Sequence, residues 1–170
     1  MRPCDGHTTV VPSLLRRLES PANFMDERSA FDTLRLALIR CGEVDEVSYA
    51  AVPHLARLSK SGALVEWEYI GLLAEVEARR ACGFGPEVPQ DLAAAYFKTI
   101  NDLPRLVGEV RPKEAREEPV AVLAGALAVA LGQPRLGMAI MELGGMLQHG
   151  GGNIECPACG EEIELTHWSG

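Results

Sequence analysis

The chain has 170 residues, of which 47% are apolar and only 5% aromatic, and its net charge is −8. A chain of this length and apolar content can bury one ordinary core, so global disorder is excluded. The acidic net charge disfavours nucleic acid as a partner, because binding to the phosphate backbone needs a basic surface.

Helical patterns follow one another along most of the chain, and no convincing alternation of apolar and polar residues indicates a strand before residue 150. The patterns predict helices over 11–18, 29–41, 45–61, 64–83, 90–110, 119–131 and 134–148. Asp45 or Ser48 is expected to cap the third helix, and Gly42 and Gly62 to end the second and third. The body is therefore predicted to be all-α.

The most apolar run, PVAVLAGALAVALG at 119–132, is too short to span a bilayer and predicts a buried helix. The first residues, MRPCDGHTTVVP, hold no apolar core of the kind a signal peptide needs. The five cysteines are scattered and odd in number, which disfavours a disulfide framework. We therefore expect a cytoplasmic protein with no membrane partner.

Three segments share an apolar residue, a proline and a leucine two positions after the proline. They are VPSLLRRL, VPHLARL and LPRLVGEV, at 11–18, 52–58 and 103–110. Spacings of about 40–47 residues are typical of two-helix repeats, and Pro12, Pro53 and Pro104 are expected near helix starts. Cys41 and Cys82, 41 residues apart, each precede a glycine at a helix end, where we expect packed side chains. The alternative is three coincidental Pro-Leu helix starts in a leucine-rich chain.

The segment SYAAVPHLARL at 48–58, which follows a helix ending near CGEVDEV, resembles bacterial HEAT-like α-solenoid repeat proteins. The resemblance covers 27–62 well and the rest of the chain only by pattern. It implies stacked helical hairpins that offer an extended surface to another macromolecule, and it implies no reaction. HEAT-like alkylpurine DNA glycosylases stack helices similarly. They need a basic, aromatic-lined groove, however, which this acidic chain with only two tryptophans, Trp67 and Trp168, does not predict.

The C-terminal stretch IECPACGEEIEL at 154–165 holds two thiols, Cys156 and Cys159, at the spacing of half a zinc site. Its flanks, NIE and EEIEL, predict a short β-hairpin around a CPxCG knuckle. We therefore divide the chain into a HEAT-like helical repeat domain at 1–148 and a tail at 149–170. The segment HGGGN is expected to act as a flexible joint between them.

A closed zinc site needs four ligands, and the knuckle supplies only two. His149 and His167 could complete a Cys₂His₂ site for Zn²⁺ with Cys156 and Cys159. The site could instead be shared in a dimer through the tail, or its second half could be missing from this chain. A second half-motif, C-x₂-H at 4–7, would reach the knuckle only if the solenoid closed. The thiols could also form an unmetallated knuckle, or a redox dithiol, although no βαβ setting supports the latter.

No catalytic set is readable from linear spacing. His54 follows Pro53 on a repeat helix, and Ser48 has no evident histidine and carboxylate partners. The glutamates at 66/68 and 75/77 are two residues apart, a rotation of about 200° on a helix, so they are not acid–base dyads. We expect them on a solvated face.

These features predict a non-enzymatic protein–protein interaction module, or scaffold, that uses the surface of a short helical solenoid. One alternative is an immunity-type protein that neutralises a toxin, because an acidic surface would complement a basic nuclease. A further alternative is a zinc- or nucleic-acid-dependent enzyme of HEAT-like fold, which would need a convergent polar cluster.

Overall fold

The computed structural model describes residues 10–61, 66–110, 117–148, 151–155 and 161–166. The helices are α1 (Val11–Glu19), α2 (Phe24–Leu38), α3 (Glu46–Leu58), α4 (Glu66–Ala81), α5 (Gln90–Asn101), α6 (Leu103–Glu109), α7 (Glu117–Ala130) and α8 (Pro134–Gln148). Two strands follow, β1 (Gly151–Glu155) and β2 (Glu162–Thr166). Every helix or strand among the described residues before β1 is an α-helix, which confirms the all-α class. Across the described ranges, no helix has the length and apolar character needed to cross a bilayer.

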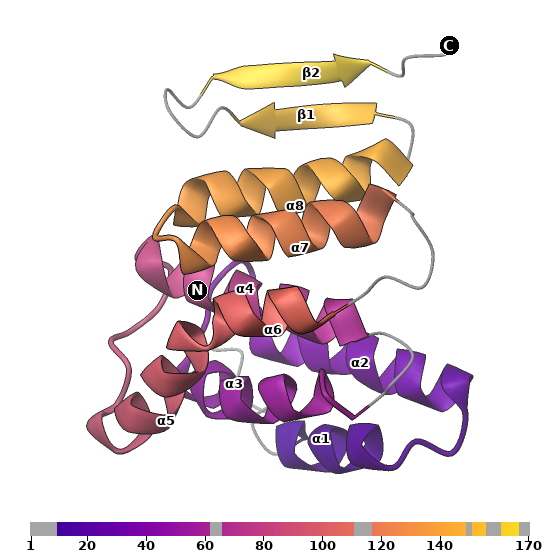
Figure 1. Cartoon of the computed structure of the whole chain (residues 1–170), viewed down its shortest axis with the longest axis vertical. Helices are drawn as coiled ribbons and strands as arrows, with labels where there is room; N and C mark the ends of the chain where they lie inside the picture. Colours follow the sequence, from indigo (N-terminus) through magenta and orange to yellow (C-terminus); the bar gives the residue numbers. More distant parts are fainter. Residues whose placement is uncertain (1–9, 62–65, 111–116, 149–150, 156–160, 167–170) are drawn as a thin grey trace.

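The helices form successive layers, from α1 at one end of the long axis to the α7–α8 pair and the strands at the other (Figure 1). Sequence neighbours pack together in α1–α2, α3–α4 and α7–α8, while α3 packs against both α1 and α5. Helix α4 contacts α7 and α8, and α7 also contacts α6. The core therefore runs through several layers.

The start of α3 uses both residues that the sequence offered as a cap. The Asp45 carboxylate accepts from the Ser48 backbone N–H at 3.0 Å, and the Ser48 hydroxyl oxygen accepts from the Asp45 N–H at 3.1 Å. Each satisfies a donor that the first helical turn leaves without a partner. The Ser48 hydroxyl also lies 2.6 Å from the Leu38 carbonyl, to which it donates. This serine therefore ties the last turn of α2 to the first turn of α3.

The turns after α2 and α4 each contain a glycine at positive φ but are built differently. Helix α2 ends at Leu38, before the Gly42 that was expected to end it, and Gly42 lies in a tight turn closed by backbone bonds between Arg40 and Glu43. Gly83 instead closes the last turn of α4, where its N–H donates to the Arg80 carbonyl at 3.0 Å. Gly42 and Gly83 have φ values of +84° and +85°, in the left-handed region where a side chain is strained. The turns are joined directly, because the Val44 N–H donates to the Phe84 carbonyl at 2.9 Å. The expectation of a packed Cys41 was wrong: this residue has φ +49° and is exposed, because the left-handed turn directs its side chain outward.

The helix predicted over 90–110 is broken into α5 and α6 at Asp102. Pro104 explains the break, since a proline removes a helical N–H and its ring clashes with the preceding turn. Pro12 and Pro104 lie in the first turns of α1 and α6, as expected. The same expectation was wrong for Pro53, which lies inside α3.

The largest side chains of the core are its three tyrosines, all fully buried, although aromatic residues are scarce. The ring of Tyr69 on α4 meets Phe31 on α2 edge-to-face, with centroids 5.2 Å apart. The ring of Tyr49 on α3 meets Tyr96 on α5 in the same way at 5.3 Å. Each pair joins one layer of helices to the next.

Helices α7 and α8 cross with their backbones in contact at two glycines. A Cβ atom added to Gly125 would lie 2.7 Å from the Gly137 carbonyl oxygen, and one added to Gly137 would lie 2.7 Å from the Gly125 oxygen. No side chain fits between the two backbones, so both positions require glycine.

Strands β1 and β2 pair antiparallel, from Gly151 opposite Thr166 to Glu155 opposite Glu162. Strand β1 lies beside α8. It begins at Gly151, so residues 151–153, expected in the joint, belong to the strand.

Candidate functional site

All four predicted zinc ligands, Cys156, Cys159, His149 and His167, lie outside the described residues, as does the C-x₂-H half-motif at 4–7. Within the described ranges, no group of three or more histidine, cysteine, aspartate or glutamate side chains could hold a metal ion. The zinc site remains a prediction from spacing.

The described helices enclose a groove of about 250 Å³ between α2, α4 and the α7–α8 pair. One part of its lining is charged and comes from α2, α4 and α8; the other is apolar and comes from α2, α4, α7 and α8. The lining residues are Arg28, Phe31, Asp32, Arg35, Trp67, Glu68, Gly71, Leu72, Glu75, Arg79, Val122, Met138, Met141 and Glu142. We treat this groove as the candidate site.

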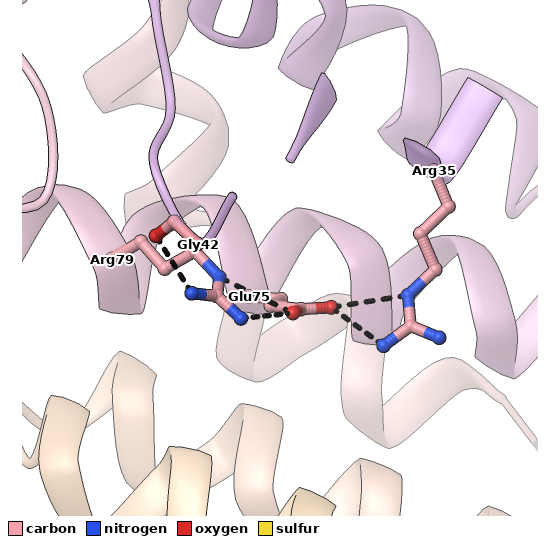
Figure 2. A network of polar contacts seen from close by, with 4 residues as sticks. All are labelled: Arg35, Gly42, Glu75 and Arg79. Atoms are coloured by element: carbon pink, nitrogen blue, oxygen red, sulfur yellow. Dashed lines mark hydrogen bonds and ion pairs between the residues drawn. The ribbon is translucent and has the colours of Figure 1, made fainter. Parts of the chain in front are cut away.

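The charged part centres on Glu75 of α4, which lies between two guanidinium groups (Figure 2). Its Oε2 atom accepts from Nε and Nη2 of Arg35 at 3.3 and 3.2 Å. Its Oε1 atom accepts from Nε and Nη2 of Arg79 at 3.3 and 2.8 Å. Arg79 also donates through Nη1 to the Gly42 carbonyl at 2.7 Å. One carboxylate thus fixes two arginines and, through Arg79, the turn after α2.

A second ion pair joins the same two helices seven residues before the first: Arg28 of α2 donates to Glu68 of α4. In both α2–α4 pairs the carboxylate is the buried partner: the side chains of Glu68 and Glu75 are 10% and 16% exposed, against 44% and 59% for Arg28 and Arg35. The expectation of a solvated glutamate face was therefore wrong, because the arginines of α2 cover these carboxylates. The groove therefore presents the guanidinium groups of Arg28 and Arg35 to solvent, together with the exposed carboxylates of Asp32 and Glu142.

The apolar part brings Trp67 of α4 together with Met138 and Met141 of α8. Gly71 makes this possible, since a Cβ atom there would lie 2.5 Å from Cγ1 of Val122 on α7. The glycine lets α7 approach α4, which places the α7–α8 pair along the edge of the groove.

Glu77 points away from the groove, as the rotation of about 200° from Glu75 requires. It is buried against α5, where Oε2 accepts from the Tyr96 hydroxyl at 2.7 Å. Arg80 donates through Nε and Nη2 to the two carboxylate oxygens of Glu77, each at 2.7 Å. The Arg80 guanidinium also lies over the Phe97 ring, 5.5 Å from the ring centroid. Burial, reinforced by the Glu77 carboxylate, raises the pKa of Tyr96 well above its ordinary range. Glu75 and Glu77 therefore serve different interfaces and do not form a dyad.

The other polar residues considered from the sequence have structural partners. The Ser48 hydroxyl is buried in the cap of α3. The half-buried His54 has its Nδ1 atom 2.9 Å from Nη2 of Arg57 on the same helix. Neither contact aligns a nucleophile with a base.

Sequence reasoning did not find the groove, although one signal for it exists. Arg28 and Arg35 are seven residues apart, and so are Glu68 and Glu75; each ion pair spans 40 residues. Opposite charges at the same seven-residue spacing on two helices predict that the helices lie side by side. No protein-family model, curated protein or solved structure matches the chain.

Proposed function

We propose that this chain is a non-enzymatic protein-interaction module that binds its partner in the groove between α2, α4 and the α7–α8 pair. The observation that carries the proposal is the lining, which includes the apolar side chains of Trp67, Met138 and Met141 as well as Arg28 and Arg35. Tryptophan, methionine and arginine are the residues enriched where proteins bind one another.

We also propose that the helices are HEAT-like hairpin repeats. Polar contacts recur between residues 37 to 42 positions apart. They are Glu19–Arg57, Glu27–Tyr69, Arg28–Glu68, Arg35–Glu75, Gly42–Arg79 and Tyr49–Pro86. Contacts at similar separations are expected when each unit stacks on the next.

The groove suits a helix or extended segment of a partner protein. Apolar anchors would bury against Trp67 and the methionines, as amphipathic helices do in hydrophobic grooves. The charged part would fix the register of such a segment, because Arg35 and Arg79 are already held by Glu75 and lose little freedom on binding.

Site-specific photo-crosslinking in the native host tests this proposal. A photoreactive residue in place of Asp32, an exposed residue of the groove, is expected to capture one discrete partner. The same residue in place of Lys98, exposed on α5 away from the groove, is the matched control. The adduct at position 32 should disappear when Trp67→Ala is combined with it. No adduct at position 32, or equal adducts at both positions, would refute the proposed binding surface.

A further inference from the structure

The outward face of α7 is apolar from Val120 to the C-terminal end of the helix. The run from Pro119 to Leu131 contains no charged residue. Val120, Leu127 and Leu131 are 57%, 39% and 69% exposed, and Ala124 between them is also exposed. A helix that is apolar all round is ordinarily covered on all sides. Among the described parts of the chain, nothing covers this face.

This face is separate from the groove. Val122, which lines the groove, is rotated by about 200° from Val120 at 100° per residue. The buried residues Ala126 and Val129 lie on Val122's side of the helix. A molecule bound to the outward face would therefore leave the groove open.

The spacing of the exposed residues is the same when read from either end of the helix. Val120, Ala124 and Leu127 of α7 and Leu131, the residue directly after it, are separated by four, three and four positions, the spacing of a coiled-coil seam. Two such helices placed antiparallel set Val120 opposite Leu131 and Ala124 opposite Leu127. Each pair joins a smaller side chain to a larger one, as interdigitated packing requires. The face is therefore self-complementary, the property that a two-fold interface needs.

We propose that α7 packs antiparallel against α7 of a second copy of this chain, across a two-fold axis between Ala124 and Leu127. Charge favours this contact over others between two copies. Each chain carries a net charge of −8, so copies repel each other wherever acidic surfaces meet. The stripe on α7 holds no ionisable group, and its burial leaves no charge without a partner.

The size of the seam sets the strength of the dimer. A helix of 14 residues is about 21 Å long, and Leu136 of α8, also exposed, extends the apolar area. A seam about 21 Å long and one helix diameter, about 10 Å, wide covers about 210 Å² on each copy. This area is well below the roughly 800 Å² that each partner contributes to a standard stable interface. The dimer is therefore expected to form reversibly with rising concentration. Added salt should tighten it, because salt screens the repulsion between the two acidic bodies.

Sedimentation of the full chain over a wide concentration range tests the proposal. The mass is expected to rise from the 18.3 kDa of one chain to twice that value, at lower concentration in high salt than in low salt. Leu127→Glu should weaken dimerisation by at least about tenfold, because it places like charges across the axis. Leu36→Glu, an equally drastic change at an exposed leucine on α2, should leave the dimer intact. Both variants should keep the helical circular dichroism of the parent.

A mixture of two variants tests the geometry itself. Antiparallel pairing about this axis sets the two copies of Leu127 about 4.5 Å apart along the helix direction. Leu127→Glu and Leu127→Lys should each be monomeric alone, and an equimolar mixture should recover the dimer. A parent chain that stays monomeric at every concentration overturns the proposal, as does a dimer indifferent to Leu127→Glu. Failure of the mixture to dimerise overturns the antiparallel arrangement.

Discussion

Alkaline pH is expected to unfold this protein, because all three of its tyrosines are fully buried as neutral phenols. The hydroxyls of Tyr69 and Tyr96 donate to the buried carboxylates of Glu27 and Glu77 at 3.1 and 2.7 Å. Burial raises the pKa of Tyr69 and Tyr96 well above the ordinary value of 10.0, and the two carboxylates add to the shift. Burial also raises the pKa of Tyr49.

The sign of the effect follows from which state releases its protons first. With a folded-state pKa above the unfolded value, the unfolded chain ionises its phenols near pH 10 while the folded chain keeps them protonated. Stability is therefore complete below pH 10.0 and falls as the pH rises beyond it. Tyr69 and Tyr96 each remove about 1.4 kcal/mol at pH 11 and about the same for the next pH unit. Tyr69 and Tyr96 together remove roughly 3 kcal/mol at pH 11, against a typical total of about 5–15 kcal/mol.

Urea unfolding followed by circular dichroism, in steps from about pH 8 to pH 11, measures this loss. Tyr96→Phe should cost about 1–2 kcal/mol at neutral pH, because it removes the hydrogen bond to Glu77. It should also flatten the alkaline decline by about 1.4 kcal/mol at pH 11. Leu106→Ala, a buried change without a titrating group, lowers stability but should leave the decline unchanged.

The near-ultraviolet band of the phenolate supplies the decisive observation. It should appear together with unfolding and not before it. Phenolate absorbance with a midpoint near the ordinary pKa of 10.0, in a chain that is still helical, would show that burial does not hold these protons. An alkaline decline equally steep in Tyr96→Phe would refute the assignment to Tyr96.

Two further changes test the contacts between helices. Gly125→Ala should lower the free energy of unfolding by about 1–3 kcal/mol, because its Cβ would meet the Gly137 backbone. Gly108→Ala, where an added Cβ would meet nothing within 4 Å, should raise the free energy of unfolding by about 0.5–1 kcal/mol through helix propensity. Equal urea midpoints for the two variants would contradict the close contact between α7 and α8. Glu75→Gln should cost about 1–3 kcal/mol because it weakens the bonds to both arginines, while Glu109→Gln at an exposed pair should change stability by less than about 0.5 kcal/mol. Thermal or urea unfolding checks both, and a Glu75→Gln protein as stable as its control would mean that the network contributes nothing.

The local features of the fold could be read from the sequence. Asp45 and Ser48 were both offered as caps of α3, and the structure uses them together. Gly42 marked a turn, because few other residues adopt its positive φ, although α2 itself ends four positions earlier at Leu38. Caps and glycine turns depend on only a few neighbouring residues, so they can be predicted without knowing how the rest of the chain packs.

The remaining features depend on what lies opposite each residue. Pro53 is accommodated inside α3, whereas the helix is interrupted just before Pro104, and the shared sequence pattern does not separate the two. Glu75 was expected to be solvated, since nothing in its own helix shows that Arg35 covers it from α2. The groove was missed for the same reason, because its walls come from helices far apart in the sequence.

The turns that follow α2 and α4 are fastened to each other by the Val44–Phe84 hydrogen bond and by the grip of Arg79 on Gly42. These two contacts oppose sliding between the turns at that edge. A partner segment bound beside Trp67 is therefore expected to leave the joined turns in place. In hydrogen exchange, the Val44 amide should accordingly be among the last loop amides to lose its proton, whether or not the groove is filled.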